Sequence, residues 1–263
     1  MWKDSETELD LLDFDYLIEI TKDIILNKNL SPCSIGIYGN WGSGKSSLME
    51  MIQKDLNEEG NVLCLKFNGW LFEGYEDART SLMIAIVKSI SENRTIKGKA
   101  KTILTNLYNN IDFFKLTSKS IKYGADFMLT GGIGVAADLM LPKLITKAKE
   151  KGKEIEEGEI EGALKSISCS IEIRENVSNF QSDFEELLEL TEIENLVVFI
   201  DELDRCNPST ILDTLEVMRL FLFAEGTSFV IGADERQIMY AIKQKFPDSP
   251  GNNIDIGKEY LEK

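Results

Sequence analysis

The 263-residue sequence contains no histidine, and no two of its four cysteines are spaced as CxxC. Catalysis by a serine–histidine or cysteine–histidine pair is therefore excluded, and a zinc ion would find few ligands. We interpret Cys33, Cys64, Cys169 and Cys206 as small buried apolar residues in a reducing compartment. Prolines are also few, at five, and no low-complexity segment is present, so extensive disorder is not expected.

Positive charge is scarce and unevenly placed. The chain has 29 basic and 45 acidic side chains, and its formal net charge is -16. Residues 94–153 hold 12 basic and 4 acidic side chains, whereas residues 154–202 hold 2 basic and 15 acidic ones. Because an acidic chain repels nucleic acid on average, we predict no direct nucleic-acid binding.

A long apolar run is also missing. The acidic N-terminus resembles neither a secretory signal nor a transit peptide. Residues 123–142 are mostly apolar, but Asp126 and Asp138 interrupt them and leave eleven residues without charge. A membrane span needs about 20 apolar residues. We favour a soluble helical hairpin here, with the GGIG sequence at 131–134 as its turn.

Lysines on both sides of this segment leave a second interpretation open. Basic flanks within residues 115–153 would suit peripheral contact with an anionic membrane surface. A true span is the third alternative. We therefore predict a cytoplasmic protein and keep the inner face of the cell membrane as an alternative location.

Apolar strands alternate with amphipathic helices along much of the chain. The pattern predicts short strands at 34–38, 62–67, 196–200 and 228–232, and the third is an uninterrupted apolar run typical of buried parallel sheets. It predicts helices at 9–27, 45–59, 77–91, 207–226 and 235–245, with Asn207 as an N-cap and Gly226 as a terminator. This alternation predicts a three-layer α/β/α fold around a parallel sheet.

The interval between the second and third predicted strands is too long for an ordinary crossover. We predict that residues 1–93 and 195–263 form one α/β core and that residues 94–194 form a mainly helical insertion. The sequence stops just after an apparent helix start near Tyr260, so we expect the natural chain to continue.

The residues GNWGSGKS at 39–46 match the P-loop pattern G-x-x-x-x-G-K-[ST], between a predicted strand and a predicted helix. Its glycines let several backbone N–H groups point at one anion beside a helix N-terminus. Lys45 should reach the β- and γ-phosphates, and the Ser46 hydroxyl should bind Mg²⁺. The predicted nucleotide-binding residues are Asn40, Trp41, Gly42, Ser43, Gly44, Lys45, Ser46 and Ser47.

Two carboxylates follow the most apolar predicted strand. Asp201 would hold the Mg²⁺ shell, and Glu202 would orient or deprotonate the attacking water. Joined to a P-loop, this pair indicates nucleotide hydrolysis. No N-K-x-D guanine-binding motif follows the P-loop, so we predict ATP rather than GTP.

Three more polar residues are candidates. Asp234 follows the fourth predicted strand, where it would either sense the γ-phosphate or cap the next helix. Phosphoryl transfer also needs a cation to balance charge in the transition state. Arg205 and Arg236 are the nearby candidates, and structural salt bridges are the alternative role for each.

Several of these motifs occur in a recognisable order, namely GNWGSGKSS at 39–47, FNGW at 67–70, VFIDELDRCNP at 198–208, FVIGAD at 229–234 and EYLEK at 259–263. Together they resemble the KAP family of P-loop NTPases, in the STAND branch near AAA+ proteins. The resemblance covers about 34–92 and 195–263. It implies an ATPase with Asp201 as the Mg²⁺ carboxylate and Glu202 as the catalytic acid.

The resemblance also bears on the insertion. Members of this family often carry transmembrane helices between the two Walker motifs, and several bacterial members resemble phage-exclusion proteins. This chain has an insertion there but no clean pair of membrane helices. It also has Gly69 before Trp70, where the family usually has alanine.

We therefore predict a Mg²⁺-dependent ATPase that acts as a conformational switch with protein partners or by self-association. The resemblance implies bacterial defence against phage as its setting. The alternative is a nucleotide-gated scaffold with negligible turnover, although a pure binder would not need Glu202. A small-molecule kinase would share the P-loop but would need an acceptor pocket that the sequence does not identify.

Overall fold

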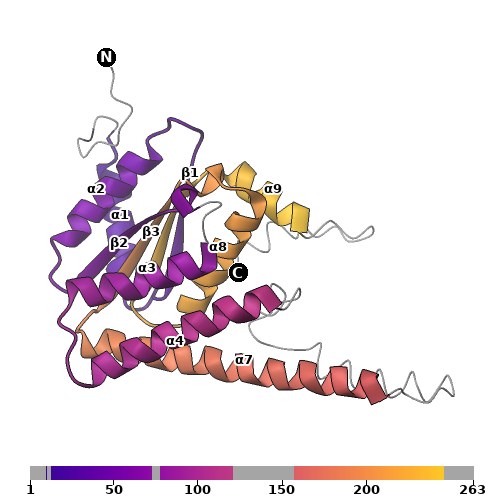
Figure 1. The fold of residues 1–263 in the computed structure, drawn as a ribbon. Helices are drawn as coiled ribbons and strands as arrows, with labels where there is room; N and C mark the ends of the chain where they lie inside the picture. The colour runs from indigo at the N-terminus through magenta and orange to yellow at the C-terminus, as the bar shows by residue number, and fades with distance from the viewer. Residues whose placement is uncertain (1–9, 11–12, 73–77, 121–156, 246–263) are drawn as a thin grey trace.

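The computed structural model describes residue 10 and residues 13–72, 78–120 and 157–245. Four strands form one sheet in the order β1-β4-β3-β2, and every pairing is parallel. The strands are β1 (Cys33–Tyr38), β2 (Val62–Asn68), β3 (Asn195–Asp201) and β4 (Thr227–Ala233). Because all four run in one direction, their carboxyl ends meet at one edge of the sheet (Figure 1).

Helices cover both faces of the sheet, which confirms the predicted three-layer α/β/α fold. Side chains alternate between the faces, so Val197 and Phe199 of β3 lie in one apolar cluster and Val198 and Ile200 in the other. Helices α1 (Asp15–Leu26) and α2 (Lys45–Asn57) contribute to the first cluster. Helices α3 (Ala78–Asn93), α8 (Pro208–Phe221) and α9 (Glu235–Lys245) contribute to the second.

Two further helices lie beyond α3 and α8. Helices α4 (Lys99–Ser120) and α7 (Glu157–Leu190) run side by side below the sheet in the view of Figure 1. Their apolar side chains belong to the same cluster as those of α3 and α8. The described part of the predicted insertion is therefore helical and shares its core with one helical layer. The division into core and insertion stays a prediction.

The predicted element bounds need two corrections. Helix α1 begins at Asp15 instead of residue 9, and α8 ends at Phe221, so Gly226 does not terminate it. Gly226 has a positive φ of 78°, and a Cβ there would lie 2.1 Å from the carbonyl oxygen of Glu194. This glycine is needed because two backbones approach closely where the chain enters β4.

The cysteine prediction is wrong in part. Cys206 is buried, but Cys33 and Cys64 are only partly buried because they lie in the two edge strands. The side chain of Cys169 and the predicted hairpin at 123–142 lie outside the described residues.

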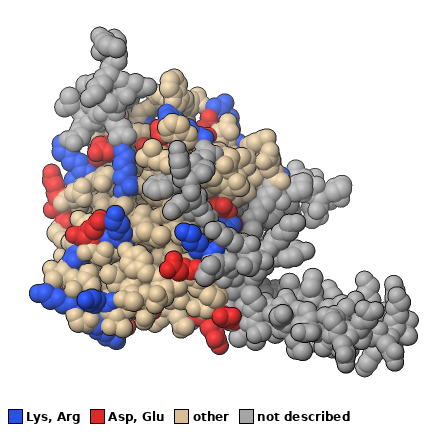
Figure 2. Space-filling model, viewed as in Figure 1, with Lys and Arg blue, Asp and Glu red and all other residues tan. Residues whose placement is uncertain are grey.

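Within the described residues, no helix has the length and apolar character that crossing a membrane requires. On the face that Figure 2 shows, acidic and basic side chains lie interspersed.

Candidate functional site

The glycine-rich turn connects β1 to α2 at the carboxyl edge of the sheet. Gly42 and Gly44 both have positive φ, at 77° and 87°, a backbone conformation that side chains with a Cβ rarely adopt. Gly44 is the N-cap of α2, so the N-terminus of this helix faces the turn. Trp41 lies within the turn and is 76% exposed. The local geometry is that of an anion-binding turn.

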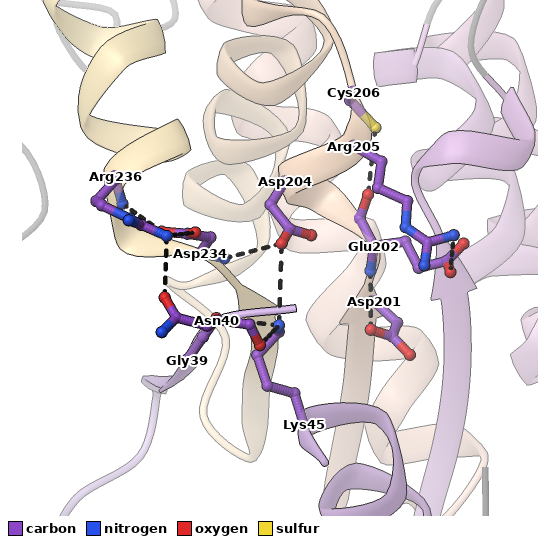
Figure 3. Close-up of polar contacts among 10 residues, drawn as sticks. All are labelled: Gly39, Asn40, Lys45, Asp201, Glu202, Asp204, Arg205, Cys206, Asp234 and Arg236. Carbon is purple, nitrogen blue, oxygen red and sulfur yellow. Dashed lines mark hydrogen bonds and ion pairs between the residues drawn. The ribbon is translucent and has the colours of Figure 1, made fainter. Parts of the chain in front are cut away.

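Lys45 is the first residue of α2 and points back across the turn. Its Nζ donates to the carbonyl oxygens of Gly39 and Asn40, both at 3.1 Å. The same Nζ lies 3.9 Å from Oδ2 of Asp204, a residue that the sequence analysis did not single out (Figure 3). Ser46 and Ser47 follow Lys45 in the first turn of α2.

Asp201 ends β3 at the same edge and is buried, with 2% of its surface exposed. Its Oδ1 accepts a hydrogen bond from the backbone N–H of Glu202 at 2.8 Å. Strand β4 lies between Asp201 and the P-loop strand. A Cβ on Gly232 of β4 would lie 3.3 Å from Asp201 Oδ1 and 2.5 Å from Met49 Sδ of α2. Glycine at this position therefore leaves room for both Asp201 and the helix that carries Lys45.

Glu202 is held on both carboxylate oxygens. Oε2 accepts a hydrogen bond from Asn68 Nδ2 at 2.8 Å, and Oε1 forms an ion pair with Arg205 Nη1 at 2.7 Å. Its backbone has a positive φ of 57°, a strained conformation for a residue with a side chain. Asn68 ends β2, the neighbour of β3.

Asn68 is a site residue that the sequence analysis missed. A usable signal was present, because a polar residue at the end of a predicted parallel strand lies at the same edge as the other candidates.

The junction of β4 and α9 (Glu235–Lys245) completes the site. Asp234 Oδ1 accepts a hydrogen bond from the backbone N–H of Arg236 at 3.0 Å. The guanidinium of Arg236 also binds this carboxylate and donates to Asn40 Oδ1 in the P-loop at 2.9 Å. Hydrogen bonding from the Arg236 side chain is the main cause that lowers the pKa of Asp234 to about 2. Both candidate arginines are thus bound to acidic side chains.

Asp204 connects the lysine to this junction. It lies in the short 3-10 helix η2 (Leu203–Arg205), and its Oδ2 accepts a hydrogen bond from the backbone N–H of Asp234 at 3.1 Å. Contacts therefore pass from Lys45 through Asp204, Asp234 and Arg236 to Asn40 and return to Lys45 (Figure 3). The acidic spacing in the sequence DELDR was the available signal for Asp204.

The oxygen donors at this edge fit a magnesium ion. Mg²⁺ is usually held by one or two carboxylates together with substrate phosphates and water. The carboxylate of Asp201 and the hydroxyl of Ser46 are donors of this kind. Asp201 ends β3 at the same sheet edge where the P-loop leads into α2, so the residues present fit a magnesium ion beside a bound phosphate group.

Comparison with known proteins agrees with this geometry. The sequence model of a family described as "KAP family P-loop domain" matches residues 14–263. An uncharacterized protein of Methanocaldococcus jannaschii, MJ0182, is 29% identical over 191 residues, which are 67% of this chain and 91% of that protein. The phage T7 exclusion protein of Escherichia coli K12 is 24% identical over 253 residues, which are 87% of this chain but only 28% of that protein.

Proposed function

The chain belongs to the KAP family of P-loop domains, and from this premise we propose that it is a Mg²⁺-dependent ATPase. Membership of this family indicates nucleotide binding. The observation that carries the further step is that Lys45 shares one sheet edge with the carboxylates of Asp201 and Glu202. A nucleotide-binding turn, an acid for Mg²⁺ and an acid for water are the parts that hydrolysis of a phosphoanhydride requires.

Different groups of the chain have different roles in the proposed hydrolysis. Backbone N–H groups of the turn and the N-terminus of α2 bind the β- and γ-phosphates, with the Lys45 ammonium beside them. Ser46 and Asp201 would hold Mg²⁺, which would neutralise charge on the phosphate oxygens. Glu202 orients the attacking water and accepts its proton.

For this role one carboxylate oxygen of Glu202 must accept a hydrogen bond from the attacking water. Asn68 and Arg205 together occupy both of its oxygens. A hydrogen bond from Asn68 is compatible with orienting the carboxylate, whereas the ion pair with Arg205 places a guanidinium against the other oxygen. We infer that Arg205 moves toward the phosphates during turnover and that Asn68 keeps Glu202 in place.

Glu202 also decides between the two functional classes. A scaffold that only binds nucleotide needs the P-loop but has no use for an acid that faces the attacking water. Here Glu202 is held in a strained conformation by two side chains from different elements. A strained backbone that places this carboxylate favours an enzyme over a scaffold.

We further propose that turnover drives a conformational switch in an anti-phage assembly. The similarity to the phage T7 exclusion protein extends over 87% of this chain, which supports that setting. The contacts from Lys45 to Asp234 and Arg236 supply a physical link from the P-loop to α9. Binding energy at the γ-phosphate would act on α9 through this link.

Three variants test the enzymatic proposal by ATP binding and phosphate release. Lys45→Ala should abolish binding, because the phosphates lose their cation. Glu202→Gln should bind ATP as the parent does but lower kcat at least about 100-fold, since the amide cannot accept the proton. Asn68→Ala should also keep binding and lower kcat about tenfold, because Glu202 loses its orientation.

Lys88→Ala is the matched control for these variants. Lys88 is an exposed lysine of α3 that pairs with Glu92, so its removal should leave binding and turnover unchanged. Intact binding with the same near-zero turnover in the parent and in Glu202→Gln would favour the scaffold instead.

A further inference from the structure

Asp204 is an acid inside the site to which the hydrolysis described above gives no role. Its Oδ2 lies 3.9 Å from Lys45 Nζ, and the two side chains are only 14% and 11% exposed. Water therefore screens this charge pair less than it screens an ion pair on the surface. At 3.9 Å the pair is an electrostatic contact and not a hydrogen bond.

The other carboxylates of the site have other partners, and Asp201 accepts a hydrogen bond from the backbone N–H of Glu202. Glu202 is held by Asn68 and Arg205, and Asp234 is held by Arg236. Asp204 accepts a hydrogen bond from the uncharged backbone N–H of Asp234 and otherwise faces the lysine. Asp204 is thus the acidic side chain of the described site that forms an ion pair with the P-loop lysine (Figure 3).

A bound triphosphate would compete with Asp204 for the same ammonium. The P-loop lysine is the group that contacts the β- and γ-phosphates. These phosphates carry negative charge, so they attract Lys45 and repel Asp204 at the same time. When the nucleotide leaves, the carboxylate can take up the lysine again. Asp204 therefore acts against retention of any phosphate tail, with or without a γ-phosphate.

We propose that Asp204 is a positioning residue that draws Lys45 back as product leaves and thereby limits how tightly the site retains ADP. The inference rests on the proposed function, since it requires nucleotide on the P-loop. Its consequence is regulatory. The carboxylate of Asp204 sets the rate of ADP release. Because Asp204 also accepts a hydrogen bond from the backbone N–H of Asp234, movement of Asp204 would affect the β4–α9 junction.

Two other roles for Asp204 make different predictions. As a further Mg²⁺ ligand it would strengthen nucleotide binding only when Mg²⁺ is present. As a brace between η2 and β4 it would support the site as a whole, and its loss would weaken binding under all conditions. Of these three roles, the anion that attracts Lys45 and repels the phosphates is the one that predicts tighter binding when its charge is removed.

The test is Asp204→Asn, which removes the charge but keeps an oxygen that accepts from the Asp234 N–H. ADP and ATP affinities are measured by calorimetry in Mg²⁺ and in EDTA, and ADP release is measured by stopped flow. We expect both nucleotides to bind about tenfold tighter in either condition, as removal of a partly screened charge near 4 Å implies. ADP release should slow by a similar factor.

Two further variants keep the result interpretable. Glu235→Gln makes the same change in net charge at an exposed position one residue after Asp234, and it should leave affinity within twofold. Asp204→Glu keeps the charge and should retain affinity near that of the parent. Circular dichroism of each variant checks the fold.

The contrary outcomes are distinct. Weaker binding of Asp204→Asn only in Mg²⁺ would make Asp204 a metal ligand, and weaker binding in both conditions would make it a brace. Either result, or unchanged affinity, overturns the inference while the ATPase proposal stands. Failure of the parent to bind nucleotide would instead overturn the proposed function and this inference with it.

Discussion

Charged side chains at the carboxyl edge of the sheet already have partners within the protein. Lys45 donates to two carbonyl oxygens, Glu202 is held by Asn68 and Arg205, and Asp234 is bound by Arg236. A ligand that reaches this edge must exchange these contacts for its own. The free energy of binding is therefore a difference between two sets of charge-assisted contacts and is smaller than the contacts with the ligand alone would give.

Asp234 and Arg236 provide a test at the residue scale. Hydrogen bonding from Arg236 lowers the pKa of Asp234 to about 2, below its ordinary value of 3.8. A depressed pKa means that the folded state holds the ionised form, so this contact stabilises the fold fully above about pH 4. The contribution should disappear as the pH falls from 4 towards 2.

The measurement is urea unfolding of the parent and of Asp234→Asn between pH 7 and pH 3. The parent should be the more stable protein, by a constant difference from pH 7 to about pH 5. That difference should shrink below about pH 4, where Asp234 in the unfolded chain becomes protonated. A difference that stays constant down to pH 3 would show that the ionised carboxylate is not what stabilises the first turn of α9.

At the scale of elements, α8 connects the site to the outer helices. It begins just after the residues that carry Asp201 to Arg205, and its buried Glu216 pairs with Arg79 of α3 at 2.9 Å. At its other end, Phe221 packs edge-on against Phe184 and Phe180 of α7, with ring centroids 4.8 and 5.4 Å apart. The aromatic contacts fix α7 to the same helix that follows Asp201 and Glu202 in the chain.

Phe184→Ala tests whether this packing stabilises the molecule. Phe184 is fully buried, so its truncation removes ring contacts and leaves a cavity between α7 and α8. The expected loss of unfolding free energy is about 3–5 kcal/mol. Urea unfolding of Phe184→Ala and of Leu190→Ala is the measurement. Leu190 lies at the end of the same helix and is 46% exposed, so its truncation should cost below about 0.5 kcal/mol.

A second outcome of that experiment concerns the layers of the fold. If α7 were a separately folded unit, Phe184→Ala would give two unfolding transitions, with the one for the sheet unchanged. A single transition at lower urea is expected instead, because α4 and α7 share one apolar cluster with α3 and α8.

For the molecule as a whole, the proposed switch requires that nucleotide binding at the P-loop is needed for phage defence in the cell. The chain spans 28% of the length of the phage T7 exclusion protein. A role of this chain in phage defence is therefore a proposal. Bacteria that express the chain should reduce the plating efficiency of a T7-like phage at least about tenfold. The Lys45→Ala variant should not protect, because the proposed switch needs nucleotide on the P-loop.

Expression of Lys88→Ala in the same host is the matched control, and it should protect as the parent does. Protection by the Lys45→Ala variant would show that the defence role does not need nucleotide binding at the P-loop. Equal plating efficiency with and without the parent would contradict the defence proposal. The ATPase proposal would still be tested by ATP binding and phosphate release.

Much of the fold followed from local patterns. The uninterrupted apolar run at 196–200 predicted a central buried strand, and every residue of β3 is buried. Asn207 before Pro208 predicted a helix start, and its side chain accepts from the N–H of Thr210. Helix α9 has the predicted bounds. These signals are local because a helix cap and an apolar run each involve residues a few positions apart.

The errors arose where distant backbone decides local structure. Gly226 has the sequence signature of a helix terminator, yet it lies five residues beyond the end of α8. Its conformation is set by Glu194, which comes from the segment before β3. A single sequence contains no local sign of such an approach.

The sequence by itself predicted the P-loop and the strand-end acidic pair of the candidate site, because each is a short segment of consecutive residues, but it did not single out Asn68 or Asp204. It also determined the order of strands and helices. Only the tertiary structure decided which side chains meet. Asn68 and Glu202 are 134 residues apart, and Asn40 and Arg236 are 196 apart. These pairs form because parallel strands bring their carboxyl ends to one edge, where side chains from four separate segments must share their charges and hydrogen bonds.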